Sequence, residues 1–351
     1  MTTRTAPAVT TPAPTPARAG IRRRLVTVVP WFALFAAAVV ALAPTVGSTP
    51  ISLARVFDQS IPWADNVDAQ IFFIARLPRV LAGAVVGGTL ASAGVVLQAL
   101  LRNPLATPFT LGVSAGAALG AMLAITLKLD LGALGVSSVP IASFVGSLVA
   151  IGIVYLLATS RKRGLSTNVL LLAGVTLNSF FSALILFVQY LSDYAETFRA
   201  VRWLMGDLDI AGFGPLVAAA PLILASFAAF AVLPRALNLL TLGDDLAASR
   251  GVDVRRAQRL AFLSASLATG AAVSLAGPVG FIGIVVPHLV RLMVGSDHRI
   301  VLPAAALFGA AFLVLCDLVA RTVMAPIELP VGIVTALIGG PFFLWLLVKK
   351  A

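Results

Sequence analysis

The chain has 351 residues, of which 60% are hydrophobic and only 11% are charged, and its mean hydropathy is +1.03. These values exclude an ordinary soluble globular domain and indicate a polytopic membrane protein. The net charge of +11 does not favour nucleic-acid binding, because the basic residues concentrate in segments that flank long apolar runs.

Residues 1–24 are rich in Pro, Thr and Ala and end in the basic run Arg22, Arg23 and Arg24. This composition predicts a disordered cytoplasmic tail. The apolar stretch that follows is long enough to cross a membrane, so we expect a membrane-embedded domain over 25–351.

Apolar runs long enough to cross the hydrocarbon core recur along nearly the whole sequence. The ten predicted spans are 27–47, 79–101, 108–127, 138–158, 166–190, 214–233, 258–277, 281–294, 302–324 and 331–348. Backbone groups in lipid must be satisfied internally, and the runs are too long and too uniformly apolar for barrel strands. The predicted fold class is therefore all-α, a polytopic membrane protein with about ten transmembrane helices.

The distribution of basic residues predicts the orientation of the chain. Ten spans place both termini on the same side, and most of the 25 basic residues then fall in segments on that side. They include Arg22, Arg23, Arg24, Arg161, Lys162, Arg163, Arg255, Arg256, Lys349 and Lys350. Because cytoplasmic loops are enriched in Lys and Arg, we expect both termini in the cytoplasm and the protein in a bacterial inner membrane.

The spans hold too few polar groups for most catalytic sites. His288 and His298 have no Cys or Glu nearby, and no G-x-x-x-x-G-K-[ST] sequence is present, so we expect no metal, no cofactor and no nucleotide site. The single cysteine, Cys316, suits buried packing. Asp317 needs a partner within the membrane, and we expect an ion pair with Arg321 one helical turn away, with a proton relay as the alternative.

Several motifs in a fixed order carry a family resemblance. The first block holds Arg76-Leu77-Pro78-Arg79, Gln98, Asn103-Pro104-Leu105-Ala106 and Leu111-Gly112-Val113-Ser114-Ala115-Gly116. The later blocks hold Leu242-Gly243-Asp244-Asp245-Leu246-Ala247, Gly277-Pro278-Val279-Gly280-Phe281-Ile282-Gly283 and Glu328-Leu329-Pro330-Val331-Gly332. Together they cover about residues 75–350 and resemble the FecCD-type permeases of ABC importers for iron-siderophore, haem or cobalamin.

The resemblance implies a fold, a function and a set of partners. It implies the type II importer architecture, a dimer with a second permease copy or a related one, a pair of ABC ATPase subunits below and a substrate-binding protein above. The chain would then be a transport subunit rather than an enzyme, embedded in lipid, with a siderophore preferred over haem or cobalamin as cargo. The alternative is an ion-gradient-driven secondary transporter, which would need buried carboxylates and no coupling segment.

The resemblance assigns the internal segment 234–259 to ATPase coupling. The assigned residues are Leu242, Gly243, Asp244, Asp245, Ala247, Gly251 and Val252. From the residues alone we expect short amphipathic helices broken by Gly243 and Gly251, with Asp253 as N-cap of the seventh span. The alternative is a solvated connector.

Two further sets of site residues are predicted. Arg76 and Arg79 flank Pro78 in the predicted first turn of span two, and the resemblance implies that they and Arg321 dock carboxylates of the binding protein, with snorkelling to lipid headgroups as the alternative. In span five, Thr167, Asn178 and Gln189 recur every eleven residues on nearly one face. Since the family uses this helix as a gate, we expect these residues with Asn168 and Leu171 to line the pathway, with helix-to-helix hydrogen bonding as the alternative.

Overall fold

The computed structural model describes residues 17–129, 138–160, 166–210 and 212–350, and the elements assigned in these ranges are all helical. In this part of the chain, seven helices are long and apolar enough to cross a membrane, and three more apolar helices are shorter. Most of the predicted tail, 1–16, and the basic loop residues Arg161, Lys162 and Arg163 lie outside the described ranges.

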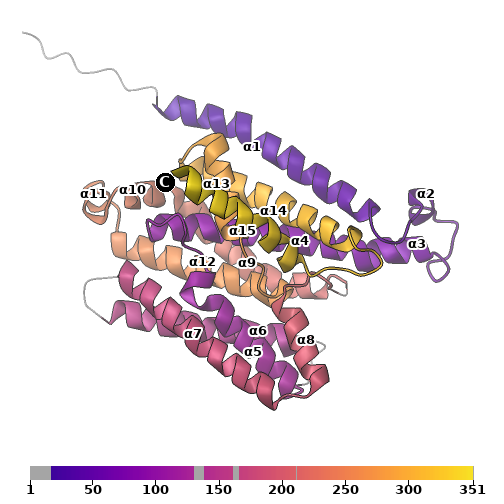
Figure 1. Ribbon diagram of the computed structural model, residues 1–351. Helices are drawn as coiled ribbons and strands as arrows, with labels where there is room; N and C mark the ends of the chain where they lie inside the picture. The colour runs from indigo at the N-terminus through magenta and orange to yellow at the C-terminus, as the bar shows by residue number, and fades with distance from the viewer. Residues whose placement is uncertain (1–16, 130–137, 161–165, 211, 351) are drawn as a thin grey trace, which may run out of the picture.

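The ten predicted spans each correspond to a helix (Figure 1). These are α1 (Ala17–Leu42), α4 (Leu77–Leu100), α5 (Val113–Thr126), α6 (Ser138–Thr159), α7 (Thr167–Leu191), α9 (Gly214–Val232), α12 (Val254–Ala276), α13 (Ile282–Val294), α14 (His298–Thr322) and α15 (Val331–Lys350). The all-α fold class is confirmed. Several boundaries differ by a few residues, and the largest difference is at α1, which begins at Ala17 and so includes 17–24, which the composition assigned to the tail.

Helices α4, α12 and α14 form the centre of the bundle, where Val86, Phe262 and Leu313 are fully buried. Small residues bring α4 and α14 into backbone contact: a Cβ added to Gly87 would lie 2.2 Å from the carbonyl oxygen of Gly309. Such close approach favours dispersion contacts where lipid supplies no hydrophobic driving force. The pair α4 and α14 is therefore a tightly packed unit.

Helix α4 continues a longer helix that begins before its predicted start. The short α3 (Val67–Gln70) and the π-helix η2 (Ile71–Arg76) lead directly into it, giving 34 continuous helical residues from Val67 to Leu100. The α-helix α4 begins beside Pro78, as predicted for span two, but the helical segment extends N-terminally from it through η2 and α3. A proline inside an α-helix clashes with the carbonyl four residues earlier, and the wider π turn just before Pro78 accommodates the ring.

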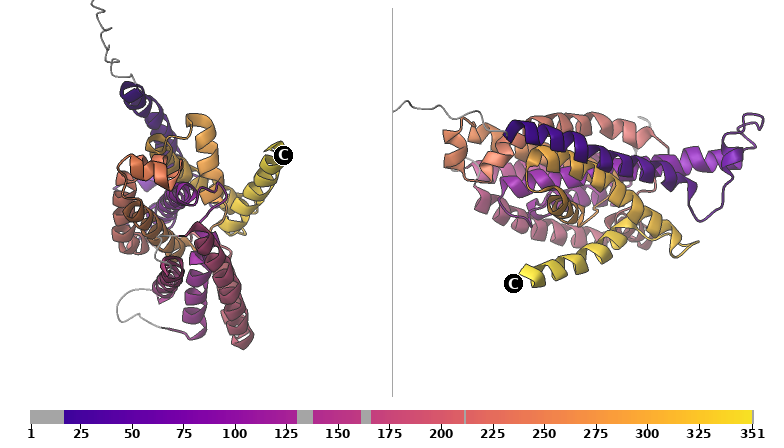
Figure 2. Two further views of the ribbon diagram at one scale, coloured as in Figure 1. Left: turned by 90° about the vertical axis from the view of Figure 1, so that its left-hand side faces the viewer. Right: turned by 90° about the horizontal axis from the view of Figure 1, so that it is seen from above.

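The short polar helices lie at the two ends of the bundle. The start of α1 and the end of α15 lie toward the same end as α10 (Pro234–Leu240) and α11 (Asp244–Ser249), whereas α2 (Leu53–Val56) and α3 lie at the opposite end (Figures 1 and 2). At 1.5 Å per residue the helix from Val67 is about 51 Å long. Since the hydrocarbon core is about 30 Å thick, this helix extends well beyond it.

Candidate functional site

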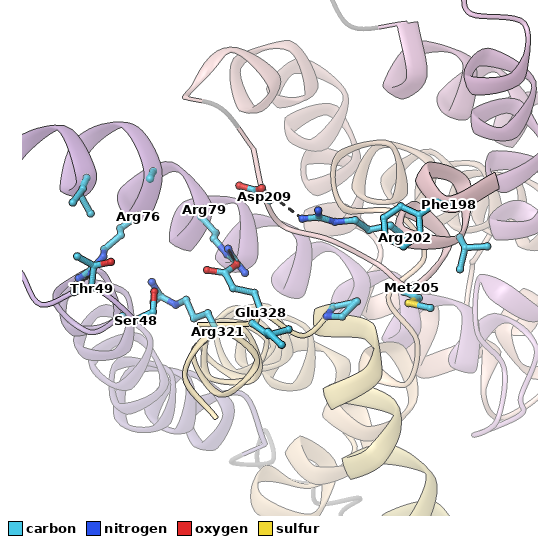
Figure 3. Close-up of a pocket in the computed structure, with 16 residues that line it drawn as sticks. Ser48, Thr49, Arg76, Arg79, Phe198, Arg202, Met205, Asp209, Arg321 and Glu328 are labelled. Carbon is cyan, nitrogen blue, oxygen red and sulfur yellow. Dashed lines mark hydrogen bonds and ion pairs between the residues drawn. The ribbon is translucent and has the colours of Figure 1, made fainter. Parts of the chain in front are cut away.

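A pocket of about 690 Å³ lies toward the end of the bundle that bears α2 and α3, and it gathers the predicted docking residues (Figure 3). Its walls come from the loop 47–49, η2, the start of α4, the end of α14 and the loop before α15, together with α8 (Tyr194–Leu204). The charged residues in its lining are Arg76, Arg79, Arg202, Asp209, Arg321 and Glu328. The predicted arginines from distant parts of the sequence therefore share one site.

Arg79 is held by two carboxylates. Its Nη2 lies 2.9 Å from Oδ1 of Asp317 on α14, and its Nη1 lies 2.5 Å from Oε2 of Glu328 in the loop before α15. The Arg79 and Asp317 side chains are almost completely buried, whereas the Glu328 side chain is 41% exposed. A buried charge needs such partners, so the pair fixes the N-terminal part of α4 against α14.

Arg321 and Arg76 bind the segment that follows α1. Arg321 Nε lies 3.5 Å from Oδ2 of Asp317, and its Nη2 donates to the carbonyl oxygen of Ala43 at 2.7 Å. Arg76 Nη1 donates to the carbonyl of Pro44 at 3.2 Å, and its Nη2 donates to the carbonyl of Thr49. The predicted ion pair between Asp317 and Arg321 is confirmed.

The setting of these arginines differs from the prediction. Arg76 and Arg79 do not lie in an exposed first turn, because the helix begins at Val67 and the segment 43–49 covers Arg76. Less than one tenth of each of the three residues Arg76, Arg79 and Arg321 is exposed. Their docking role stays a prediction, and any partner group must reach them through the pocket.

The charges of the cluster do not balance. Arg79 and Arg321 pair with the two carboxylates Asp317 and Glu328, whereas Arg76 bonds to backbone carbonyls, so the three arginines together hold one excess positive charge. A positive pocket with low-dielectric walls favours an anionic group. Sequence reasoning missed Arg202 on α8, whose Nε lies 3.2 Å from Oδ2 of Asp207. The signal for α8 was present as a capping box, in which Asp193 and Glu196 bond reciprocally.

The segment 234–259 folds as the sequence predicts. Helices α10 and α11 are separated by Gly243 at φ +125°, α11 ends before Gly251 at φ +80°, and Asp253 accepts a hydrogen bond of 3.0 Å from the amide of Arg256. A Cβ at either glycine would meet open space, so backbone conformation rather than packing requires glycine there.

The predicted coupling residues differ in exposure, and only one of them is buried. Leu242, Asp244 and Asp245 are exposed, Gly243 and Val252 are half-buried, Gly251 is exposed and Ala247 is buried. Leu246, which the site prediction omitted, is also exposed, four residues after Leu242. Large exposed apolar side chains on one short segment are typical of a surface that a partner covers.

The predicted pathway residues lie on α7, one face of which is uncovered in this chain. Thr167, Leu171 and Gln189 are half-buried and Asn168 is exposed. Asn178 Nδ2 donates to the carbonyl of Phe109 at 2.9 Å, in the 3₁₀ turn η3 (Phe109–Leu111) that precedes α5. This contact is of the kind that the packing alternative describes for Asn178. The pathway role of the five residues stays a prediction.

No group of three or more His, Cys, Asp or Glu side chains converges within the described ranges. A bundle of apolar helices, with a basic pocket toward one end and an exposed leucine-bearing turn at the other, defines a multi-pass membrane transport subunit. The chain belongs to the FecCD transport family, whose model matches residues 33–349.

Individual proteins similar in sequence or structure to this chain are also transport permeases or ABC transporters. The chain is 43% identical to the hemin transport system permease protein HmuU of Yersinia pestis, over 80% of this chain and 84% of the relative. It is 46% identical to the cobalamin import system permease protein BtuC of Halobacterium salinarum, over 78% and 72%. It also resembles a solved structure assigned to the metal-chelate type of ABC transporter, in an inward-facing conformation, with a TM-score of 0.79, 33% identity and coverage of 93% and 100%.

These findings establish the coarse function. The chain is a permease subunit of an ABC importer of the class that carries metal chelates, haem or cobalamin, and it is not a catalytic subunit. Its family and structural relatives imply ATPase and binding-protein partners in general terms. None of them supports the alternative of a secondary transporter.

Proposed function

We propose that this permease carries an iron chelate, a ferric siderophore in preference to haem or cobalamin, from an external binding protein into the bacterial cytoplasm. Both termini lie in the cytoplasm in this proposal, and a separate ATPase dimer hydrolyses ATP. The supporting observation is the placement of the two candidate surfaces toward opposite ends of one bundle: the basic pocket toward one, the exposed turn of α10 and α11 at the other.

The basic pocket is the proposed docking site for the binding protein. The excess positive charge over Asp317 and Glu328 favours an incoming carboxylate, which would approach Arg79 from the side where Glu328 is exposed. Arg76 and Arg321 contribute charge while holding the segment 43–49 in place.

The turn between α10 and α11 is the proposed seat of the ATPase. Leu242 and Leu246 expose 66% and 43% of their surfaces beside Asp244 and Asp245. The sequence contains no P-loop motif, so the energy of ATP must enter through contact with another chain.

A second permease copy is the proposed partner for the uncovered apolar faces of α7 and α15. Leu172, Leu186 and Phe187 of α7 are exposed, as are Leu337 and Leu344 of α15. Helix α15 projects from the bundle (Figure 2). Lipid covers whatever the second copy leaves free. In this proposal Thr167, Asn168, Leu171, Asn178 and Gln189 line the pathway between the copies.

Reconstitution tests the proposal. The permease, its ATPase subunit and its binding protein are combined in liposomes with trapped ATP. Uptake of a labelled hydroxamate ferric siderophore, haem and cobalamin is then measured in parallel. We expect ATP-dependent uptake of the siderophore only when the three proteins are present. Uptake that needs an ion gradient and no ATPase would contradict the proposal, and preferential uptake of haem or cobalamin would correct the cargo.

A further inference from the structure

The turn that follows α4 has an unusual residue at its C-terminal cap. The amide of Asn103 donates to the carbonyl of Gln98 and the amide of Arg102 donates to the carbonyl of Ala99, which is the pattern of a Schellman motif. The left-handed position of this motif is usually glycine, but here it is Arg102 with φ +49°. A side chain is disfavoured in that conformation, so the position suggests that the arginine side chain has a role.

The Arg102 side chain reaches the coupling segment and bridges its two short helices. Its Nε donates to the carbonyl of Leu240, the last residue of α10, at 2.7 Å. Its Nη2 pairs with Oδ1 of Asp244, the first residue of α11. One planar guanidinium therefore spans both sides of the bend at Gly243, and its fork of donors suits two partners at once.

The same bend has a second attachment. Gln258 Nε2 of α12 donates to the other oxygen of Asp244 at 3.3 Å. Helix α10 is attached separately, because Asn238 Nδ2 donates to Oδ1 of Asp297, the N-cap of α14, at 2.8 Å. Of these contacts, only that of Arg102 joins α10 and α11 to each other and to α4.

Helix α4 connects the Arg102 contact to the basic pocket toward the other end of the bundle. With α3 and η2 it forms one helical segment from Val67 to Leu100, and the first turn of α4 carries Arg79 in the basic pocket. Packing of Gly87 against Gly309 resists sliding of α4 along α14. A displacement of α4 would therefore move Arg102 and, through its contacts with Leu240 and Asp244, the bend at Gly243.

We propose that Arg102 is a positioning residue that holds the bend between α10 and α11 in the geometry that seats on the ATPase and connects that bend to α4. This rests on the proposed coupling role of the segment. Arg102 itself touches neither substrate nor nucleotide in this proposal. The Arg102 side chain fixes the angle between α10 and α11, and α4 transmits displacements between this bend and the basic pocket.

The most informative variant is Arg102→Gly. Glycine suits the left-handed cap, so this change should keep or raise the melting temperature of the permease while it removes the bridge. We expect amides in 241–251 to lose protection from hydrogen exchange in the purified permease. In the reconstituted transporter we expect substrate uptake per ATP hydrolysed to fall about fivefold or more.

Two further variants separate position from charge. Arg102→Lys keeps the charge but cannot bridge two partners with one rigid fork, so it should give intermediate uptake per ATP. Arg23→Gln removes an exposed arginine of α1, toward the same end of the bundle, and should match the wild type in both measurements.

The outcomes distinguish this inference from the proposed function. If wild-type permease neither recruits nor stimulates the ATPase, the coupling assignment itself fails. If the wild type couples normally, the inference is overturned by an Arg102→Gly variant with normal uptake per ATP. It is equally overturned if uptake falls while exchange in 241–251 stays unchanged, because Arg102 would then not act through the bend.

Discussion

Asp317 is the central carboxylate of the charged cluster in the basic pocket. It lies within ion-pair distance of both Arg79 and Arg321, and all three side chains are nearly buried. Removing one member of a buried charge set costs more than the set contributes as a whole, because the remaining charges lose their partner. Glu328 differs, since water reaches it and screens its pair with Arg79.

These environments predict different stabilities for two matched substitutions. Asp317→Asn should lower the free energy of unfolding by about 3 kcal/mol or more, since it leaves buried Arg321 without an anion and Arg79 with only the partly exposed Glu328. Glu328→Gln should cost about 0.2 to 1 kcal/mol. Thermal unfolding in detergent compares them, and equal melting temperatures would show that the Asp317 pair is as screened as a surface pair.

The same exposed glutamate predicts a gain in docking. Glu328 occupies Arg79 Nη1, the donor that an incoming carboxylate would use, so Glu328→Gln should raise the affinity of the binding protein several-fold at low salt. Titration of the binding protein against permease in nanodiscs measures this. An unchanged or weaker affinity would remove Arg79 from the docking surface. Reversing the charge of Arg79 is a poorer test, because it would place a carboxylate beside buried Asp317.

At the scale of elements, glycine conformation is the clearest link from sequence to function. Gly243 at φ +125° and ψ 151° lies in a region that residues with a Cβ avoid, although space around it is open. Gly152 on α6 also faces open space but lies within an ordinary α-helix. A side chain would meet open space at both positions, so they differ only in whether the backbone conformation disfavours a residue with a Cβ.

We expect Gly243→Ala to reshape the bend between α10 and α11 without preventing membrane insertion, at a local cost of about 1 to 3 kcal/mol. Recruitment of the ATPase, measured by copurification, should fall. Gly152→Ala should leave recruitment unchanged, because alanine favours a helix interior. Normal recruitment by Gly243→Ala would argue that the bend does not need its present geometry.

The N-terminus of α14 predicts a pH dependence. The hydrogen bond from the Arg299 side chain, with further bonds from Asn238 and the Arg299 amide, lowers the pKa of Asp297 from 3.8 to about 2. A depressed pKa means that the stabilisation is complete above the unfolded value and is lost as pH falls through the folded one. The stability difference between wild type and Asp297→Asn should therefore be constant above about pH 5 and shrink toward pH 2. Melting temperatures across this range measure it, and a difference that grew on acidification would contradict the assignment.

Across the whole molecule, hydropathy was sufficient to locate the ten membrane helices, because lipid demands long apolar helices. It did not show that the helical segment extends N-terminally from α4 to Val67, since Pro78 suggests a helix start unless a π turn precedes it. The resemblance pointed to the three arginines of the pocket, and the four-residue spacing predicted the pair of Asp317 and Arg321. The contacts of Arg79 with Asp317 and Glu328, however, join residues up to 249 positions apart. No periodicity encodes such contacts, nor the bridge from Arg102 to Asp244.

The arrangement of the two ends gives a topology that can be tested with single cysteines. Cys316 is buried, so Cys316→Ser provides a background without the native thiol. Ser60 is exposed in the loop between α2 and α3, and Ser249 is the exposed last residue of α11. Helices α2 and α3 lie toward one end of the bundle and α11 toward the other (Figure 1). The excess of basic residues on the side of α11 predicts that this side is cytoplasmic. In intact spheroplasts an impermeant maleimide should label Ser60→Cys but not Ser249→Cys, and permeabilisation should expose both. Labelling of Ser249→Cys before permeabilisation would show that the orientation is the inverse of the proposed one. The bend between α10 and α11 would then lie outside, where no ATP is available, which would contradict the proposed function.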